Sequence, residues 1–453
     1  MKTDSVKIEA IREAGFRSDP SYHLSEGVEV KRMVSRSPYS LKTVGDVTSN
    51  IFIGNRAKRV YVTNRDHGIP FLSSSDILKA DLENVKLASA KYTPEIEQMR
   101  LKKGWTLISR SGTIGNCAFA NAKHAQKLAS EDVIRACPNN ILRAGVLYAY
   151  LASQYGHSLL TQGTFGAVIQ HIEPAFVASL PIPMFPEEFQ KEVDGMIQES
   201  ARLREEAADA LGEAKSFFDD KFQINVPSNK FSSVTIQSIH SSQNHRFEAN
   251  YYGAEGAKYE KLITENFKHE PLNDFFFDIS RPDIFKRKYV SADAGLMFFG
   301  SSELFMATPH SNKFVSKKTA GLESLILQEG WVLLPRSGTI GDVAYATSQH
   351  AQKLASEDVI RLKPNNILRG AYAYGFLLSQ AGKAMLQRAI FGSVIQHIEP
   401  PMLKFIPVPL FEEKFEEIAN LVISANKKLG RAGELELEAI SMVEAEIEKW
   451  SKE

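Results

Sequence analysis

Residues 104–186 and 330–412 are two copies of one sequence, aligned at a constant offset of 226 residues without a gap. The run from His124 to Arg135 recurs letter for letter from His350 to Arg361. A repeat of this length indicates a duplicated domain, because the units of solenoid proteins are only roughly 20–50 residues long. Two copies of one domain in a single chain predict binding to something that itself has two halves.

The duplication extends toward the N-terminus of each copy. Three further pairs of blocks match at nearly the same offset: residues 17–23 with 246–252, 58–62 with 286–290, and 71–77 with 298–304. Each unit is therefore about 225 residues long, and the two units fill the chain. Between the matched blocks, residues 78–103 and 305–329 hardly resemble each other. We expect these two segments to hold the residues that make the copies unequal.

Composition excludes several classes of protein. The chain of 453 residues is long enough for two or more domains with ample cores. It has no run of about 20 apolar residues, so no membrane span is expected, and its first residues lack the apolar core of a signal peptide. Cys117 and Cys137 are the only cysteines, which excludes a disulfide framework and a cysteine zinc site. We therefore expect a cytoplasmic protein.

The net charge of zero conceals an uneven distribution of charge. Residues 187–221 hold 5 Lys or Arg against 11 Asp or Glu, and residues 412–453 hold 6 against 11. Of the 54 basic and 54 acidic residues in the chain, 43 basic and 32 acidic residues lie outside these two segments. The pattern predicts acidic helical segments and a basic globular body, and a basic body suits a polyanionic partner.

Each unit is predicted to have a mixed globular part. In the first copy, residues 105–109 and 132–135 have strand patterns, a helix is expected over residues 141–161, and residues 180–183 form an extended exit. Strands and helices thus alternate irregularly, which indicates an α+β fold.

A long helix is predicted after each globular part. Apolar residues recur every three or four positions on a charged background over residues 187–221 and again over 412–450. Gly430 and Gly433 are candidates for an interruption of the second helix. One such helix cannot bury its apolar stripe alone, so we expect the two to pack as an antiparallel coiled coil. At 1.5 Å per residue, they would space the globular parts about 45 Å apart.

The clearest local signal is a duplicated glycine turn with the sequence Arg-Ser-Gly-Thr-Ile-Gly. A guanidinium, two hydroxyls and exposed backbone amides in one tight turn suit contacts with phosphates or base edges. The candidate side chains are Arg110, Ser111 and Thr113 in the first copy, and Arg336, Ser337 and Thr339 in the second. A β-turn with a solvated arginine is an equally good interpretation.

Two other duplicated features could contact a polyanion. Serine loops contain Ser74 and Ser75 in the first copy and Ser301 and Ser302 in the second, although a simple loop is the favoured interpretation. Basic clusters precede a tyrosine in both copies, and a phosphate-binding role for them competes with that of a solvated face. These clusters contain Arg56, Lys58 and Arg59 in the first copy, and Lys286, Arg287 and Lys288 in the second.

The remaining motifs favour structure over catalysis. Residues 165–174 and 391–400 contain Gln-His-Ile-Glu-Pro just before a predicted helix, which favours docking of that helix over base reading. His124 with Glu131 and Asp132 is the only catalytic group that the sequence offers, and such carboxylates more often fix neighbouring cations such as Arg135. No dinucleotide-binding glycine motif, P-loop, His-Glu-x-x-His motif or nucleophile elbow occurs.

These features together resemble the specificity subunit of type I restriction–modification enzymes. The resemblance covers nearly the whole chain, and its specificity lies in the duplicated order of the motifs. It is carried by the openings with Arg17 and Tyr22 or Arg246 and Tyr251, the glycine turns, the Pro-rich exits at residues 180–183 and 406–409, and the long helices. One feature departs from the family, because recognition domains in one chain usually differ, whereas here they are similar.

The resemblance implies a non-catalytic reader of double-stranded DNA without a cofactor or metal of its own. It would bind methyltransferase subunits, which supply S-adenosylmethionine chemistry, and a restriction motor subunit. The implied fold is α+β, with target-recognition domains at 1–185 and 226–409 and helical spacers at 186–225 and 410–453 in a pseudo-twofold arrangement. Two alternatives stay open: a recognition subunit for a fused methyltransferase–nuclease, and a duplicated enzyme acting on a small substrate.

Overall fold

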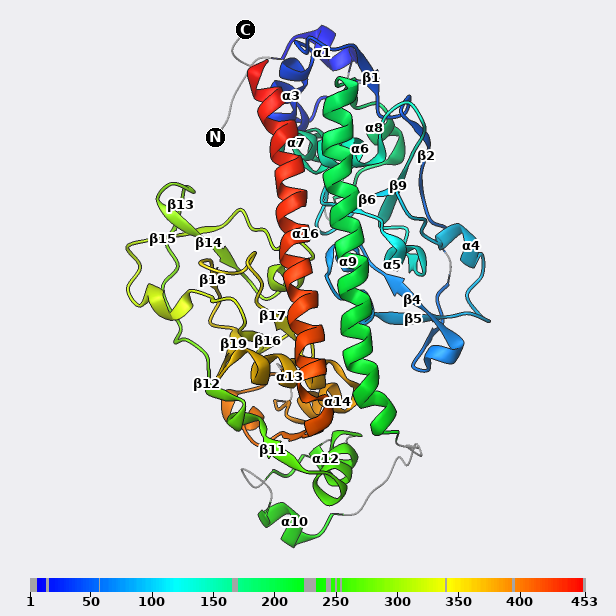
Figure 1. Cartoon of the computed structure of the whole chain (residues 1–453). Coiled ribbons are helices and arrows are strands. Elements are labelled where there is room, and N and C mark those ends of the chain that lie inside the picture. Colours follow the sequence, from blue (N-terminus) through cyan, green and yellow to red (C-terminus); the bar gives the residue numbers. More distant parts are fainter. Residues whose placement is uncertain are drawn as a thin grey trace. The chain divides into compact units, whose positions relative to one another are not determined.

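The computed structural model describes residues 6–13, 16–56, 58–164, 170–223, 234–241, 246–248, 251–252, 255–338, 340–392 and 396–450. The chain forms two compact units, whose helices and strands are traced in Figure 1. Unit 1 comprises residues 1–205 together with 432–453, and unit 2 comprises residues 206–431. No helix among the described residues is long and apolar enough to cross a membrane.

The described part of unit 1 contains three small sheets. One four-stranded sheet has the order β2-β9-β6-β7, with β2 at Thr48–Ile53, β9 at Val133–Pro138, β6 at Thr106–Ser109 and β7 at Cys117–Phe119. The other has the order β3-β5-β4-β8, with β3 at Tyr61–Val62, β5 at Lys86–Ser89, β4 at Gly68–Leu72 and β8 at Leu128–Ala129. A third sheet pairs β1 (Leu41–Thr43) with β10 (Pro181–Pro183).

Unit 2 repeats these sheets strand for strand. Its first sheet has the order β12-β19-β16-β17, with β12 at Phe276–Ser280, β19 at Val359–Pro364, β16 at Val332–Pro335 and β17 at Ala344–Tyr345. Its second has the order β13-β15-β14-β18, with β13 at Tyr289–Val290, β15 at Phe314–Ser316, β14 at Gly295–Phe299 and β18 at Leu354–Ala355. A third sheet pairs β11 (His269–Pro271) with β20 (Pro407–Pro409). The duplication read from the sequence is thus a duplication of topology.

Some of the helices of the two units also correspond. Unit 1 contains α1 (Ile8–Glu13), α2 (Pro20–His23), α3 (Glu26–Val34), α4 (Ile96–Met99), α5 (Ala122–Ala125), α6 (Ala144–Ala152), α7 (Gln154–Gln162) and α8 (Pro174–Ala178). Unit 2 contains α10 (Ile236–Ser241), α12 (Glu255–Asn266), α13 (Ile367–Leu378), α14 (Gln380–Arg388) and α15 (Pro400–Leu403). In unit 1, the sheet β2-β9-β6-β7 and the helices α6 and α7 share one hydrophobic core. In unit 2, the sheet β12-β19-β16-β17 and the helices α13 and α14 share the equivalent core.

The single helix predicted over residues 141–161 is wrong in one respect, because it is broken into α6 and α7 at Ser153. The Ser153 hydroxyl donates to the carbonyl of Tyr150 at 2.6 Å and accepts from the amide of Gly156 at 3.1 Å. A Cβ on Gly156 would lie 2.1 Å from the Tyr150 carbonyl oxygen, so only glycine fits this corner. Ser379 breaks α13 from α14 in the same way.

Both long helices are confirmed. Helix α9 spans Glu187–Lys221, and α16 spans Phe415–Lys449 after a short 3-10 turn. Helix α16 continues through Gly430 and Gly433, so the expected interruption is wrong. At Gly430 the missing side chain has a packing reason, because a Cβ there would lie 2.8 Å from the Ser348 hydroxyl oxygen.

The two long helices pack antiparallel within each unit. In unit 1, Ile197 of α9 shares a core cluster with Val443 of α16, whereas Leu203 packs further back along α16 with Ala432. In unit 2, Glu206 of α9 forms a 2.8 Å ion pair with Lys428 of α16, and Phe218, further along α9, shares a core cluster with Ile418 of α16. Partner numbers fall along α16 as they rise along α9, so the antiparallel prediction is confirmed in both units.

Candidate nucleic-acid interface

The glycine turn of unit 1, residues 110–115, connects β6 to β7. Gly112 has φ of 72° and Gly115 has φ of 82°, which is the left-handed region that favours glycine. The turn closes with the Gly115 amide donating to the Ser109 carbonyl at 3.0 Å. In unit 2, Gly338 and Gly341 have φ of 79° and 102°. Both turns thus require their glycines, while Thr339 lies outside the described residues.

The arginine of each glycine turn is bound to carboxylates, so the interpretation as a solvated arginine is wrong. Arg110 is 9% exposed, and its guanidinium contacts Glu173 and lies 3.9 Å from Asp132. Arg336 lies 2.7 Å from Glu399 and 3.4 Å from Asp358. The main chain of each arginine is also paired, as the Arg110 amide donates to the Asp132 carbonyl at 2.8 Å. The two side chains therefore brace the turn.

The Gln-His-Ile-Glu-Pro segment docks onto this turn. Ser111 forms a β-bridge with His171, and Ser337 forms the same bridge with His397. The amide of Ile172 donates to the Arg110 carbonyl at 3.3 Å. The segment thus pairs with the turn, and α8, which follows it, packs into the core of unit 1 through the buried Val177. Residues 165–169 and 393–395 of the two segments lie outside the described residues.

Burial and hydrogen bonding have opposite effects on the pKa of Glu399, which belongs to the Gln-His-Ile-Glu-Pro segment of unit 2. Burial raises the pKa of Glu399, but hydrogen bonds from Arg281 and Arg336 outweigh it, so the pKa lies below its ordinary value. The carboxylate thus stays ionised while it holds two guanidinium groups. In unit 1, the position of Arg281 is occupied by Ile53, and Glu173 binds Arg110, with the His171 ring nitrogen 3.6 Å away.

A fully buried arginine shapes the loop that the two copies share letter for letter. We call residues 129–133 and 355–359 the carboxylate loops. Arg135 is 0% exposed and donates to the carbonyls of Ala129 at 2.6 Å and Ser130 at 2.9 Å, and also to that of Val133. Burial lowers the pKa of Arg135 to about 10. The expectation that neighbouring carboxylates fix Arg135 is wrong, because main-chain carbonyls do so.

The carboxylate loop of unit 2 is built in the same way. Arg361 is 1% exposed and donates to the carbonyls of Ala355 at 2.7 Å and Ser356 at 3.0 Å. Each loop presents two successive carboxylates, which are Glu131 and Asp132 or Glu357 and Asp358. The second carboxylate of each pair faces the arginine of the glycine turn.

The first carboxylate of each loop holds an arginine of the basic cluster. Glu131 contacts Arg59 and lies 3.7 Å from Arg56. The guanidinium of Arg59 lies over the Phe71 ring, 4.8 Å from its centroid. Lys58 is exposed. The cluster is thus divided into one braced arginine and exposed cations around it.

In unit 2 the same division holds. Arg287 donates to both oxygens of Glu357, at 2.7 and 2.8 Å, and lies 5.3 Å from the centroid of the Phe298 ring. Lys286 is exposed, as is the neighbouring Lys288. The basic clusters that align in the sequence therefore also make equivalent contacts in the two units.

The serine loops lie beside the glycine turns. In unit 1, the Ser109 hydroxyl donates to the Ser74 carbonyl at 2.8 Å, and the Ser130 amide donates to the Leu72 carbonyl at 3.0 Å. Ser75 is exposed. In unit 2, the Ser356 amide donates to the Phe299 carbonyl at 3.0 Å, next to Ser301 and the exposed Ser302. The structure thus joins four separate sequence motifs around each carboxylate loop.

The hydroxyls of the glycine turns differ between the units. In unit 1, Ser111 is half-buried, and the exposed Thr113 donates to Ser109 at 3.2 Å. In unit 2, Ser337 donates to Asp358. The second carboxylate of the loop therefore binds both a guanidinium and a hydroxyl of the turn in unit 2.

The catalytic group suggested by the sequence is not assembled. His124 is buried, and its ring nitrogens contact Asn121 at 2.8 Å and the Ile77 carbonyl at 3.3 Å, whereas Glu131 and Asp132 face the arginines. His124 and Asn121 form the capping box of α5. Among the described residues, no group of three or more His, Cys, Asp or Glu could hold a metal ion.

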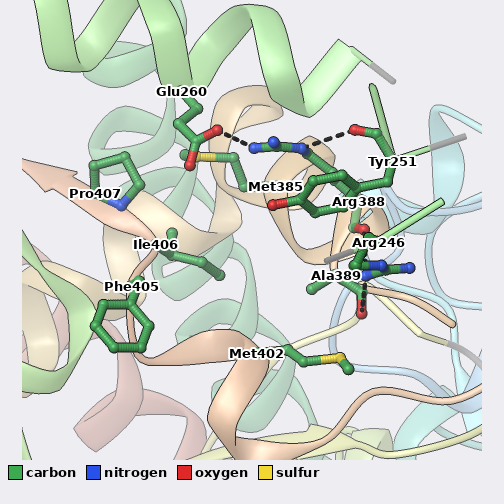
Figure 2. Close-up of a pocket in the computed structure, with 10 residues that line it drawn as sticks. All are labelled: Arg246, Tyr251, Glu260, Met385, Arg388, Ala389, Met402, Phe405, Ile406 and Pro407. Carbon is green, nitrogen blue, oxygen red and sulfur yellow. Dashed lines mark hydrogen bonds and ion pairs between the residues drawn. The ribbon is translucent and has the colours of Figure 1, made fainter. Parts of the chain in front are cut away.

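A cavity of about 50 Å³ lies elsewhere in unit 2 (Figure 2). The ring of Tyr251 lies there between Arg246 and Arg388, whose guanidinium carbons are 4.6 and 4.1 Å from its centroid. Arg388 donates to the Tyr251 carbonyl at 2.9 Å and pairs with Glu260. A space of this size admits only a few water molecules. These contacts dock the opening block of the unit.

No protein-family model matches the chain, and no curated protein matches it. Several solved structures are similar to it, including the following three. The type I restriction–modification S subunit from M. genitalium is 14% identical, with 91% of this chain and 96% of that chain covered and a TM-score of 0.32. The HsdS subunit from Thermoanaerobacter tengcongensis has the same identity and coverage and a TM-score of 0.29. A chain from a structure of a type I restriction–modification system is 15% identical, with 91% of this chain and 98% of that chain covered and a TM-score of 0.28.

The buried histidines give the fold a defined pH dependence. Burial lowers the pKa of His124 to about 4, so the folded residue is neutral while the unfolded one, with its ordinary pKa near 6.5, binds a proton. We expect the stability of unit 1 to fall as the pH is lowered from about 6.5 toward 4, by up to about 1.4 kcal/mol per pH unit for this residue. Thermal unfolding measured between pH 7.5 and 5 checks the slope.

A variant and a control isolate this contribution. His124→Gln should lower the unfolding temperature at pH 7.5 but flatten its pH dependence. His67→Gln changes an exposed histidine and should keep the slope of the parent protein. An equally steep pH dependence in His124→Gln would assign the effect to other groups.

Proposed function

We propose that the protein is the DNA sequence-recognition subunit of a type I restriction–modification complex. One observation carries the proposal. In each unit, a basic cluster, a serine loop and a glycine turn lie around the carboxylate loop of that unit. A duplicated, pre-organised set of cations and hydroxyls suits a ligand that repeats itself, and double-stranded DNA with two half-sites is such a ligand. The excess of basic residues outside the long helices favours the same ligand.

The side chains divide by the contact that each can make. We assign phosphate contacts to the exposed Lys58, Lys286 and Arg56, and such contacts fix register but carry no sequence information. The hydroxyls and backbone amides of the glycine turns, with Ser74, Ser75, Ser301 and Ser302, are candidates for base edges. Arg110 and Arg336 act as braces that hold the turns, and Arg59 and Arg287 do the same for the basic clusters.

The long helices are proposed to bind the partner subunits. Methyltransferase subunits would supply S-adenosylmethionine chemistry, and a restriction subunit would supply the motor and the nuclease. Helices α9 and α16 bury their apolar residues in the cores of the units and carry an excess of acidic residues on the remaining surface. An acidic, extended surface suits partners that must stay clear of the polyanionic ligand.

The salt dependence of DNA binding tests the proposed contacts. Lys58→Ala should weaken binding to every duplex by a similar factor and lower the slope of log affinity against log salt by roughly 1, because one phosphate contact is lost. Fluorescence anisotropy with labelled duplexes at several salt concentrations measures both quantities. Lys191→Ala, which removes an exposed lysine of α9, is the matched control. Binding of Lys58→Ala with the unchanged slope would remove this residue from the interface.

The role of the arginine in the glycine turn has its own test. If Arg110 braces the turn through Glu173, then Arg110→Ala and Glu173→Ala should each cost about 1–3 kcal/mol of specific DNA binding. The double variant should cost no more than either single variant, because both remove one interaction. A Glu173→Ala protein that binds its target like the parent, beside an impaired Arg110→Ala protein, would show that Arg110 reads the DNA directly.

Exchange of the domains tests the assignment of sequence reading. Like domains read like half-sites, so we expect a bipartite target whose halves are related by near inversion and separated by a non-specific spacer. Replacing residues 20–183 with residues 249–409 should then make the target fully palindromic with the spacer unchanged. Methylome sequencing of a host that carries the exchanged chain and its partners identifies the site. Methylation of the original, unsymmetrical site would place sequence reading outside these domains.

A further inference from the structure

We infer that Ile284 reads a thymine in the half-site of unit 2 by apolar contact with the C5-methyl group of the base. The inference rests on the proposed function and adds a specificity-determining residue to it. Ile284 is 82% exposed, although it belongs to the loop between β12 and β13 that carries the basic cluster of unit 2.

The loop around Ile284 is anchored on both sides of it. Arg281 donates to Glu399 at 3.0 Å, and Arg287 donates to Glu357 at 2.7 Å. Glu399 also holds Arg336 of the glycine turn. Ile284 lies midway between these two anchors. The chain from Arg281 to Arg287 therefore runs beside the glycine turn, within the candidate interface.

Buried neighbours fix the direction in which the loop presents Ile284. Pro282 is buried, and Phe285 is half-buried with its ring centroid 6.1 Å from that of Phe298. Pro282 and Phe285 thus pack against the unit, while the side chains of Asp283 and Ile284 between them stay in solvent. Exposure of a large aliphatic side chain at a braced position is unfavourable in the free protein, so a ligand surface that covers it would gain free energy.

The other unit has a different side chain at this position. Two residues before the matching lysines Lys58 and Lys286, unit 1 has Arg56 and unit 2 has Ile284. The Arg56 side chain is equally exposed, at 82%. An arginine there can contact phosphate or guanine, whereas an isoleucine has no hydrogen-bonding group. The apolar feature on base edges in the major groove is the thymine methyl group. The position therefore makes the two half-sites unequal.

Substitution of uracil for thymine tests the contact, because uracil lacks only the methyl group. The full-length protein first selects its target from a pool of random duplexes. Each thymine of that target is then replaced by uracil in turn, and the affinity is measured by anisotropy. We expect one position at which uracil weakens binding about threefold to tenfold. Ile284→Ala should bind the thymine and uracil duplexes equally at that position and differ from the parent at no other.

Controls separate this contact from other roles of the residue. Ile367→Ala removes an isoleucine that is 52% exposed at the start of α13 and should keep the full response to uracil. Ile284→Arg introduces the residue that unit 1 has at this position. This variant should lose the thymine preference, and its affinity for DNA should fall more steeply as the salt concentration rises. If no single uracil affects the parent protein, or if Ile284→Ala keeps the thymine preference, the inference is overturned.

A role for Ile284 in binding a protein partner would give another result. Ile284→Ala would then bind all duplexes like the parent but fail to co-purify with the methyltransferase subunits, which also overturns the inference. Failure of the proposed function is distinguishable from all of these outcomes, because the parent protein would then select no sequence from the random pool.

Discussion

A guanidinium buried in a cage of main-chain carbonyls is the interaction on which the rest of each unit depends. Arg135 donates to the carbonyls of Ala129, Ser130 and Val133, and Arg361 donates to those of Ala355, Ser356 and Val359. Removing a charge from water is costly unless hydrogen bonds replace those to solvent. The cage supplies those bonds, and in return the loop is fixed in one conformation. This mutual requirement gives a physical reason for the letter-for-letter repeat of the segment.

The fixed loop explains why carboxylates occupy a surface proposed to meet DNA. Glu131 and Glu357 hold arginines of the basic clusters, and Asp132 and Asp358 lie against those of the glycine turns. Each arginine is thereby pre-organised, so little side-chain entropy is lost when a ligand binds. The carboxylates also reduce the positive charge of the surface, which weakens non-specific attraction to phosphates more than it weakens contacts that depend on shape.

The two copies combine a common frame with local differences. Residues 78–103 and 305–329 hardly match in sequence, yet β5 in the first and β15 in the second occupy the same place in their sheets. Arg281 gives Glu399 a second guanidinium that unit 1 lacks, and Ile284 replaces Arg56. Differences of this kind change side chains on the surface while the sheet order and the core stay the same. Such a frame suits half-sites that are related but unequal.

Much of this architecture could be predicted from the sequence. The constant offset of 226 residues predicted two equivalent globular parts, and the sheets of the two units repeat the same strand order. Spacing of three and four predicted α9 and α16 and their antiparallel packing, because a long apolar stripe must be covered. The duplicated glycine motif predicted a tight turn in each copy, and Gly112, Gly115, Gly338 and Gly341 adopt the left-handed backbone of such turns.

Tertiary structure alone decided how the functional side chains are used. The sequence gives no sign that Arg135 is buried or that Arg110 faces Glu173, 63 positions further along the chain, because burial of a charge depends on partners brought in by the fold. His124 looked like part of a catalytic group because Glu131 and Asp132 are near in sequence, whereas the turn of α5 directs its ring toward Asn121 and Ile77. Sequence order determines which residues are available, but only the packed fold determines which of them meet.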